Sequence, residues 1–434
     1  MKLSAFGGIG RALSNRDYRV YTYGSSASLI GTWMQRAAVG WLAWELTHDP
    51  KWVGIVVSAD LLPSIVASPI AGVLADRLHP MRMLKVLQVL AALQALALAV
   101  MTFGGFLTVE VLTVMTLLLG VIMGFNHPVR QTMIYQLVRR EDLSAAVATT
   151  SVIFNTSRVI GPAIAGFVIH FGGAGIAFSL NAVTFMVMLG ALAAIKLPPQ
   201  APRPRSSLSV VGDIMAGYRY AFAHKGIAPT LLISLSAALL VRPAVEMLPA
   251  FVGQVFAGGA DSLGLILAAN GVGAMLSGIW LAWRGSAHGL VAIAIWSTVL
   301  SAVALAGFAA SSSFWVGTGF IFLLGIAMSL RGTATQTLIQ NAVDPSMRGR
   351  VLSLNTLIFN AGPAAGAFSL GLIASWAGLQ PPLYVAAALS LAVWLWAWLR
   401  RERLTQYLEG PDTHEGGGAI PDAPAPEAPP RPAE

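Results

Sequence analysis

Hydrophobic residues occur in long, nearly uninterrupted runs along almost the whole chain. A helix that crosses a bilayer needs about 20 mostly apolar residues. Measured by that length, the chain contains about twelve such runs, which predict twelve transmembrane helices. The predicted segments lie at roughly 21–45, 52–75, 83–104, 108–136, 145–170, 174–195, 228–256, 262–283, 288–310, 314–340, 349–377 and 380–400.

The pattern within these runs excludes the other common membrane architecture. A transmembrane β-barrel shows ten-residue segments in which apolar and polar residues alternate, and these runs are too long and too uniformly apolar for that. The 44 glycines and 24 prolines suit helices that pack closely and bend inside a membrane. The sequence therefore predicts an all-α membrane protein.

Composition excludes most alternative classes of protein. Residues in the AVILMFWYC set make up 56% of the chain and charged residues only 11%, whereas a soluble domain carries about 25% charge. A chain this apolar has too little polar surface for a soluble enzyme. The absence of cysteine excludes disulfide scaffolds, thiolate metal sites and thiol catalysis.

Basic residues between the predicted spans indicate the orientation in the membrane. They cluster before the first span, in alternate loops and after the last span, while the opposite loops carry only Lys51. Because cytoplasmic loops are enriched in Lys and Arg, both termini are expected in the cytoplasm of a bacterial inner membrane. The net charge of +8 is then a topology signal, and no nucleic-acid partner is expected.

The pattern also predicts domain boundaries. Residues 1–196 and 228–404 are expected to form an N-terminal and a C-terminal six-helix bundle. Residues 197–227 begin with a Pro-rich stretch and continue into a weakly amphipathic segment, which predicts a cytoplasmic linker with a surface helix. Residues 405–434 are rich in Pro, Gly and Ala, so a disordered cytoplasmic tail is expected.

The two halves are related by an internal repeat. A shift of about 205 residues aligns 120–173 with 325–378 without a gap, and places Gly161, Gly166 and Gly173 on Gly366, Gly371 and Gly378. Nearly the same shift places Arg36 on Arg242, and a short gap later Asp60 falls on Asn270. Parallel repeats of this kind occur in secondary transporters whose substrate site lies at the interface of the halves.

Two motifs carry a resemblance to a known family. After the second predicted span, Gly72-Val-Leu-Ala-Asp76-Arg77 is followed by Arg82, and arginines in such a loop can bind carboxylates or lipid phosphates. In the fifth span, Arg158 precedes Gly161, Pro162 and Gly166. There the proline bends the helix and the glycines allow close contact across the halves. Topology signalling and structural packing are the respective alternatives.

The loop motif is similar to that of the major facilitator superfamily (MFS), and the fifth-span motif resembles the Gly-Pro motif of its export antiporters. The chain is identified as a member over about residues 14–404. The runs at 33–36, 44–47, 62–63 and 72–77 resemble the bacterial branch that contains enterobactin and macrolide exporters. The resemblance implies an MFS fold of two bundles in pseudo-two-fold parallel repeat, and drug or siderophore efflux coupled to proton entry.

Charged residues inside the spans are costly, so they usually face a cavity or a partner. Arg36 and Asp60 lie at similar depths, roughly 12–14 Å from the same membrane face at 1.5 Å per residue, so we predict an ion pair between them in at least one conformation. Glu246 lies one turn after Arg242, where their side chains can meet, and Pro243 predicts a kink there. Both pairs are candidates for proton coupling, and static ion pairs that stabilise packing are the alternative.

Further candidates lie in other spans. Arg130 resembles the fourth-span arginine of the family, which is thought to help proton transfer, and is therefore a third coupling candidate. The remaining cavity candidates are polar or aromatic residues within spans: Trp33, Gln35, Asn126, His127, Asn155, Asn270, Arg331 and Asn360. For His127, helix packing or hydrogen bonding is the favoured interpretation over a proton relay.

The leading hypothesis is a secondary transporter that works by alternating access and exports a small amphipathic molecule, with the proton gradient as its energy source. A lipid or lysophospholipid flippase or a nutrient uptake carrier is the alternative, and a non-transporting membrane sensor is the alternative from another class. No phosphate-binding loop, His/Glu metal spacing or nucleophile elbow is present in the loops, so no enzyme, metal or bound cofactor is expected. The expected partners are a small-molecule substrate and membrane lipid, and the protein is expected to be monomeric.

Overall fold

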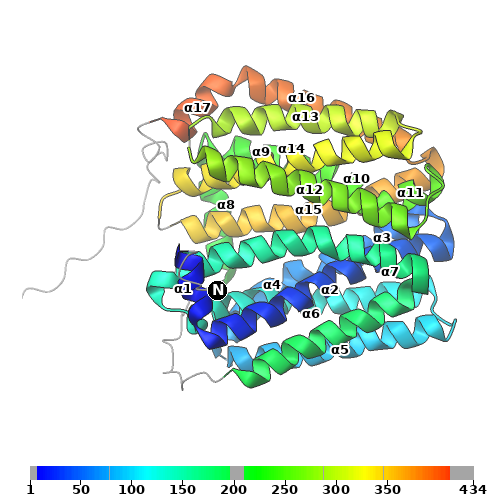
Figure 1. Cartoon of the computed structure of the whole chain (residues 1–434). Coiled ribbons are helices and arrows are strands. Elements are labelled where there is room, and N and C mark those ends of the chain that lie inside the picture. The colour runs from blue at the N-terminus through cyan, green and yellow to red at the C-terminus, as the bar shows by residue number, and fades with distance from the viewer. Residues whose placement is uncertain (1–6, 78, 196–209, 287, 346, 411–434) are drawn as a thin grey trace, which may run out of the picture.

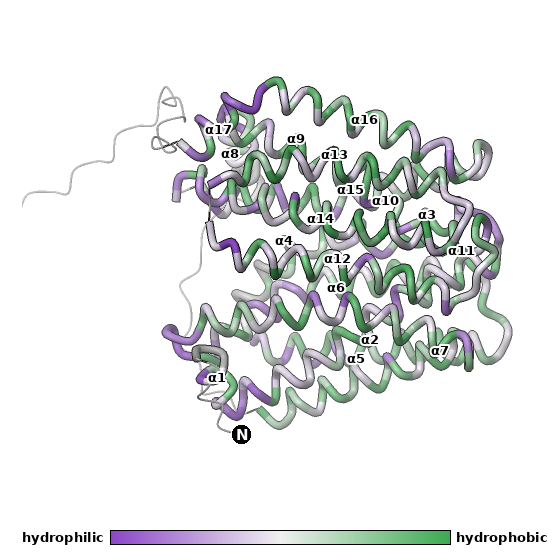
Figure 2. The backbone as a smooth tube through the Cα atoms, turned by 45° about the horizontal axis from the view of Figure 1, so that its top comes forward, coloured by the Kyte–Doolittle hydropathy of each residue, from purple (hydrophilic) through white to green (hydrophobic). Residues whose placement is uncertain are grey.

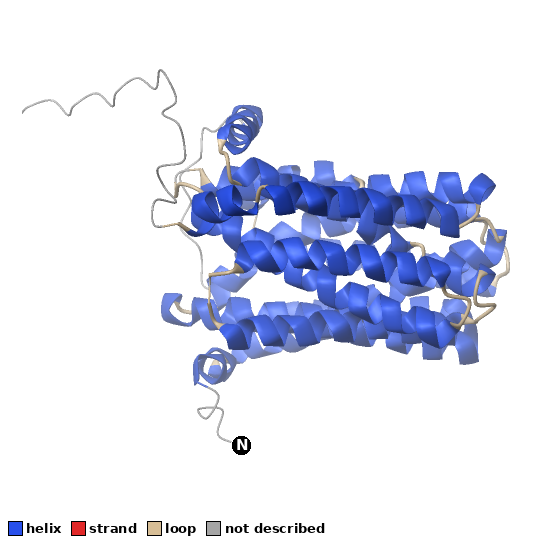
Figure 3. Cartoon of the chain, turned by 90° about the horizontal axis from the view of Figure 1, so that it is seen from above, coloured by secondary structure: helices blue, strands red, loops and turns tan. Residues whose placement is uncertain are grey.

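The computed structural model describes residues 7–77, 79–195, 210–286, 288–345 and 347–410, apart from the side chains of 7–9, 69, 72, 73, 75–77 and 210–214. Every regular element within these residues is a helix, and short loops join the helices at their ends (Figure 3). Hydrophobic residues predominate along the long helices, and a strongly hydrophilic stretch lies at α17 (Figure 2).

The first half begins with a short helix and continues into long antiparallel ones. Its elements are α1 (Gly7–Ser14), α2 (Arg16–Thr47), α3 (Pro50–Leu61), α4 (Pro63–Arg77), α5 (Pro80–Phe103), α6 (Val109–Leu137), the short η2 (Arg140–Asp142) and α7 (Leu143–Ala194). Helix starts follow local chemistry: the Asn15 side chain accepts hydrogen bonds from Asp17 N and Tyr18 N, and Pro50 and Pro80 occupy first-turn positions where no backbone donor is needed.

The helix α7 is 52 residues long but reverses direction at Gly173, where φ is 77° and ψ is 170°. Contacts with α2 establish the reversal. Before Gly173 the chain runs parallel to α2, with Ala146 near Tyr18 and Gly161 near Ile30. After it the direction is opposite, since Asn181 contacts Gln35 and Ala191 contacts Gly24. Glycine is required because an L side chain rarely adopts this φ.

The second half contains α8 (Val210–Ala223), α9 (Ile227–Ser236), the π-helical η3 (Ala237–Val241), α10 (Arg242–Glu246), α11 (Leu248–Gln254), α12 (Ala260–Arg284), α13 (Leu290–Ala310), α14 (Phe314–Ala342), α15 (Arg348–Ala377), α16 (Gln380–Leu399) and α17 (Arg401–Glu409). The predicted seventh span is thus divided into α9, η3, α10 and α11, and α10 begins with Arg242 and the predicted kink residue, Pro243. A proline lacks the backbone donor that an uninterrupted helix would use.

Ten helices in the described residues are long and apolar enough to cross a membrane. That number counts both arms of α7 as one helix and does not include α2, whose serines, threonines and charged residues lower its hydropathy. The all-helical membrane fold is therefore confirmed, while the number of twelve spans stays a prediction.

The internal repeat has a direct structural counterpart in two helix crossings between the halves. A Cβ placed on Gly166 in α7 would lie 2.8 Å from the Cα of Gly264 in α12, and one placed on Gly371 in α15 would lie 3.1 Å from the Cα of Gly54 in α3. The repeat aligns Gly166 with Gly371 and Gly54 with Gly264, so the two crossings are equivalent. Only glycine permits such close backbone approach. The repeat also pairs Gly173 with Gly378, which has the same conformation, φ 82° and ψ 166°.

The hydrophobic cores show that the halves share a buried core at one end. One core combines residues of both halves, including Trp44, Val53, Phe251 and Leu379, at the end near the α7 reversal. The cores toward the other end are separate: one contains Tyr18 and Leu137 from the first half, the other Leu290 and Leu404 from the second. The separate cores lie at the end that holds α1 and α17 (Figure 1), which we call the terminal end; the shared core lies at the opposite end.

Candidate functional site

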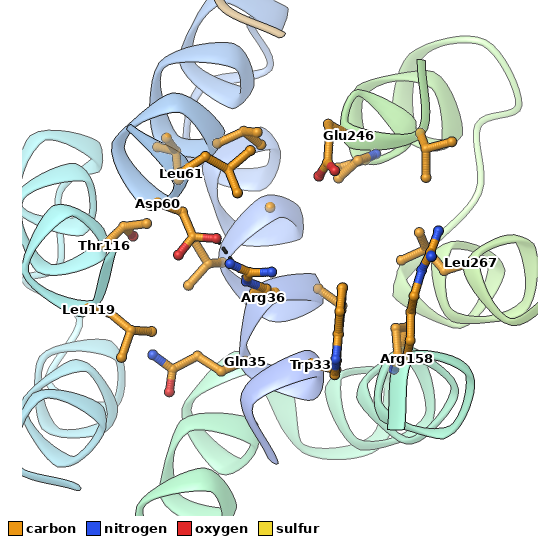
Figure 4. Close-up of a pocket in the computed structure, with 18 of the residues that line it drawn as sticks. Trp33, Gln35, Arg36, Asp60, Leu61, Thr116, Leu119, Arg158, Glu246 and Leu267 are labelled. Atoms are coloured by element: carbon orange, nitrogen blue, oxygen red, sulfur yellow. Dashed lines mark ion pairs between the residues drawn. The ribbon is translucent and has the colours of Figure 1, made fainter. Parts of the chain in front are cut away.

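A cavity lies between the two halves and is lined by both predicted charged pairs. It has an empty volume of about 930 Å³ and is lined by residues of α2, α3, α6, α7, α10, α11 and α12. We call it the central cavity. Four of the charged residues that line it are shown in Figure 4: Arg36, Asp60, Arg158 and Glu246. Helices of both halves therefore place their charges at one site.

The predicted ion pair between Arg36 and Asp60 is present. Arg36 Nε lies 2.8 Å from Asp60 Oδ2, and the two side chains are 32% and 12% exposed (Figure 4). Asp60 Oδ1 is buried without a hydrogen-bond partner in the described part of the chain. The guanidinium of Arg36 also lies 5.2 Å from the ring centroid of Trp33, a cation–π distance. The pair is thus held in a mostly apolar setting, with one carboxylate oxygen unused.

The equivalent arginine of the second half finds a different partner. Arg242 donates from Nε to Glu246 Oε1 at 2.8 Å, one helical turn away. Asn270, the repeat counterpart of Asp60, cannot form an ion pair, and its amide instead donates to the Ile321 carbonyl oxygen at 3.1 Å. The repeated arginine is therefore neutralised across helices in the first half and within one helix in the second.

A chain of buried amides lies behind the Arg36–Asp60 pair. Asn181 Nδ2 donates to Gln35 Oε1 at 2.6 Å, Gln35 Nε2 donates to Gln94 Oε1 at 3.0 Å, and Gln94 Nε2 donates to the Met115 carbonyl oxygen at 3.0 Å. Gln35 is among the sequence candidates, but Gln94 and Asn181 are not. Their signal in the sequence is an amide in the middle of an apolar run. Fully paired amides of this kind fix the relative positions of α2, α5, α6 and α7.

A second cavity between the halves lies closer to the terminal end. Its empty volume is about 1230 Å³, and its basic lining residues are Arg158, Arg242 and Arg331. We call it the arginine cavity. Arg158 and Arg242 also line the central cavity, so these two arginines lie between the cavities. Arg331 is 3% exposed, and its Nη1 donates to Ser301 Oγ at 3.3 Å.

Arg130 does not join these groups. It donates from Nη1 to Ser25 Oγ at 3.0 Å and from Nη2 to Ser28 Oγ at 2.9 Å, and it lines neither cavity. Its contacts are with α2 in the same half, so its predicted part in proton coupling stays a prediction.

The remaining candidates fall into three groups. Trp33, Gln35, Pro162 and Asn270 line the central cavity, Asn155 lines the arginine cavity, and Asn126, His127 and Asn360 line neither. Gly161 and Gly166 pack against α2 and α12, respectively. Of the loop motif, Gly72, Asp76 and Arg77 have side chains outside the described residues, and Arg82 is exposed.

Both cavities combine polar and charged lining groups with apolar ones. The charged groups of the central cavity are two carboxylates and three arginines, and protonation of either carboxylate would free an arginine. No cluster of three or more His, Asp or Glu residues that could hold a metal ion exists among the described residues.

Comparison with known proteins agrees with this architecture. A family model described as "Transmembrane secretion effector" matches residues 11–409. The staphyloferrin A transporter of Staphylococcus aureus is 25% identical over 341 residues, which cover 77% of this chain and 84% of that protein. The enterobactin exporter of Escherichia coli is 26% identical over 75% of this chain and 77% of its own. The multidrug resistance protein MdtG of Proteus mirabilis is 24% identical over 80% and 85%, respectively.

Solved structures agree on the fold. A peptide transporter matches with a TM-score of 0.74 at 12% identity, covering 90% of this chain and 95% of its own. A bacterial homologue of the human lysosomal transporter Spinster, solved in an inward-facing and unoccupied conformation, matches with a TM-score of 0.66 at 13% identity over 92% and 98%. With a family model that covers nearly the whole chain, this protein belongs to the transmembrane secretion effector family of major facilitator superfamily transporters.

Proposed function

We propose that the protein is a proton-coupled exporter of a small amphipathic molecule, embedded in the bacterial inner membrane with both termini in the cytoplasm. The observation that carries the proposal is the Asp60 carboxylate. It lines a cavity between the halves, is 12% exposed, pairs with Arg36 and has one buried oxygen without a hydrogen bond in the described part of the chain. A carboxylate in that position is suited to exchange a proton when its arginine moves away.

The packing of the halves supports alternating access. With the basic loops in the cytoplasm, the terminal end faces inward, and the shared core with its two glycine crossings closes the outward end. The structure then corresponds to an inward-facing state. Transport requires the halves to separate at Gly54–Gly371 and Gly166–Gly264 and to approach each other at the terminal end.

The ion pairs supply a way to couple that motion to protons. When Asp60 is protonated it no longer holds Arg36 by charge, and the cavity gains a net positive charge. When Asp60 releases its proton, the ion pair forms again. Glu246 offers the same exchange with Arg242, so each half contains one carboxylate–arginine pair next to the cavity. A conformational preference that depends on these protonation states couples proton entry to export.

Export as the direction is supported by the relatives. Their names include an enterobactin exporter and a multidrug resistance protein. A transporter that moves its substrate outward with proton entry must take it up at the cytoplasmic side, where the arginine cavity lies in the proposed orientation.

Export is tested in a bacterium that lacks its own major efflux pumps. The strain expresses the wild type, the Asp60→Asn variant or the control Glu402→Gln, whose side chain in α17 is 89% exposed. Ethidium, erythromycin and a siderophore are the probes. We expect the wild type and the control to lower the accumulation of at least one probe, and Asp60→Asn or a protonophore to abolish the effect. Accumulation unchanged by the wild type for every probe would overturn export.

A further inference from the structure

The basic groups of the arginine cavity have no acidic counterpart in its lining. None of its described lining residues is Asp or Glu. The central cavity differs, because Asp60 and Glu246 line it together with its arginines. The excess of positive charge between the halves is therefore concentrated toward the terminal end.

Pairing reduces this excess by only one charge. Arg242 is neutralised by Glu246. Arg331 has one hydrogen bond, to the neutral hydroxyl of Ser301, and Arg158 has neither a hydrogen bond nor an ion pair with any described residue. Glu246 also attracts Arg158 but cannot neutralise both Arg158 and Arg242. The four arginines that line the two cavities therefore exceed the two lining carboxylates by two positive charges. Such groups are costly inside a membrane and mark substrate pathways.

The other lining residues match an organic anion. Asn155, Gln336 and Asn355 supply amide groups, and Phe154 and Phe359 supply aromatic faces. Phe154 packs edge-on against Trp33 with 5.8 Å between ring centroids, and the guanidinium of Arg242 lies 5.8 Å from the ring centroid of Phe359. Guanidinium groups bind carboxylates through two parallel hydrogen bonds, while the aromatic faces favour a planar or apolar body.

We propose that the arginine cavity binds a small organic polyanion that carries at least two carboxylate groups, with Arg158 and Arg331 as the ligands that compensate its charge. The proposal rests on the proposed function, because it names the substrate class of the same transporter. Two unpaired arginines require two negative charges for neutrality, and the aromatic faces hold the carbon skeleton between them.

Arg242 gives the proposal a second, opposite consequence. In the empty cavity its charge is held by Glu246, so that carboxylate competes with the ligand for Arg242. Removal of the Glu246 charge leaves all three arginines available to the polyanion. The Glu246→Gln variant is therefore expected to bind a polyanion more tightly, whereas Arg331→Gln binds it more weakly.

The test is calorimetric binding to the purified full-length protein in lipid nanodiscs at low salt. The probe is benzene-1,3,5-tricarboxylate, and the matched control ligand is its neutral trimethyl ester. We expect the tricarboxylate to bind and the ester not to bind. The Kd is expected to rise at least tenfold in Arg331→Gln, to fall at least threefold in Glu246→Gln, and to stay unchanged in Arg139→Gln, a control whose side chain is 83% exposed.

The outcomes separate this inference from the proposed function. Equal binding of the ester, no binding of the tricarboxylate, or no tightening in Glu246→Gln overturns the polyanion site, even if Arg331→Gln fails to fold. If ethidium is exported in exchange for protons while the tricarboxylate does not bind, the export proposal stands and the polyanion site falls. If the tricarboxylate binds as expected but no probe is exported, the polyanion site stands and the export proposal falls.

Discussion

Arg36 Nε on α2 lies 2.8 Å from Asp60 Oδ2 on α3, and both residues line the cavity between the halves. Their repeat counterparts, Arg242 and Asn270, cannot form the same pair, and Arg242 is instead neutralised by Glu246 on its own helix. The duplicated scaffold thus keeps the arginine and changes the position of the acid. This asymmetry gives each pair a separate consequence when it is broken.

Removal of one member of the Arg36–Asp60 pair is expected to destabilise the protein more than removal of both. Arg36→Gln leaves the Asp60 carboxylate, 12% exposed, without its cation, at a cost of about 2 kcal/mol because the pair is only partly buried. The double variant Arg36→Gln with Asp60→Asn leaves no unpaired charge and is expected to recover most of that loss. Thermal unfolding in lipid nanodiscs measures the cycle. If the loss of stability in the double variant equals the sum of the losses in Arg36→Gln and Asp60→Asn, the two residues are not coupled.

Substitution of either repeat-related glycine pair is expected to weaken the closure at the outward end. In Gly264→Val the new side chain meets the backbone of Gly166 and Pro162, and overpacking of this kind costs about 1–3 kcal/mol unless the helices separate. Gly371→Val is expected to act alike on Gly54. The control is Gly319→Val, because a Cβ there would meet nothing within 4 Å. Hydrogen exchange of α3 and α12 measures the separation, and an equal response in the control would refute the account.

Single cysteines report directly on which end is open, because the chain contains no cysteine of its own. Asn155→Cys in the arginine cavity is expected to react with a membrane-impermeant thiol reagent in inside-out vesicles and to be protected in right-side-out vesicles. Val53→Cys, whose native side chain is buried in the shared core and 0% exposed, is expected to be protected in both. Labelling of Asn155→Cys only in right-side-out vesicles would show that the arginine cavity opens to the outside, which contradicts a cytoplasmic terminal end.

The α8–α9 corner is expected to be sensitive to acid. His224 is 2% exposed and its Nδ1 accepts hydrogen bonds from Gly226 N and Ile227 N at 3.1 and 3.2 Å. Burial lowers the pKa of His224 below its usual value, so the folded corner binds fewer protons than the unfolded one. Its stability is full above the unfolded pKa of about 6.5 and falls as the pH drops below that value.

Hydrogen exchange at residues 224–230 between pH 8 and pH 5 measures this effect. Faster opening toward pH 5, after correction for intrinsic exchange, is the expected result. In His224→Asn the dependence on pH is expected to vanish. A profile in His224→Asn that matches the wild type would assign the acid sensitivity to another group.

The C-terminal helix is expected to stabilise the start of α13. Glu409 accepts hydrogen bonds from Gly289 N and Val291 N, both at 2.7 Å, at a helix N-terminus where a negative charge is favourable. Glu409→Gln is expected to cost about 1 kcal/mol and to lower Tm by a few degrees. The control is Glu402→Gln, whose native side chain is 89% exposed. Equal Tm values for Glu409→Gln and Glu402→Gln would contradict a stabilising role for this contact.

Much of the fold follows from the sequence because hydrophobic runs, prolines and glycines act locally. The run at 52–75 is broken at Leu62 and Pro63, and the boundary between the fifth and sixth predicted spans falls at Gly173, where the backbone needs a positive φ. The low hydropathy of α2 is one reason why ten helices, and not twelve, are long and apolar enough to cross a membrane among the described residues. The repeat also anticipates the equivalence of the two glycine crossings.

Only part of the site can be predicted from the sequence, because the hydrogen-bond and ion-pair partners of its residues come from helices that are far apart in the chain. The depth of Arg36 and Asp60 predicts their contact, but the amide chain from Asn181 through Gln35 to Gln94 joins three helices, and no spacing along the sequence encodes it. The position of Arg158 between the two cavities likewise depends on how the halves cross.

Proton movement driven by a substrate in proteoliposomes tests the central claim most directly. The wild type is reconstituted with a pH-sensitive dye inside, and ethidium or benzene-1,3,5-tricarboxylate is added outside under a protonophore-sensitive pH gradient. The account predicts a substrate-dependent proton flux in the wild type and in Glu402→Gln, and its loss in Asp60→Asn combined with Glu246→Gln while substrate binding persists. Undiminished proton flux in that double variant would contradict the account.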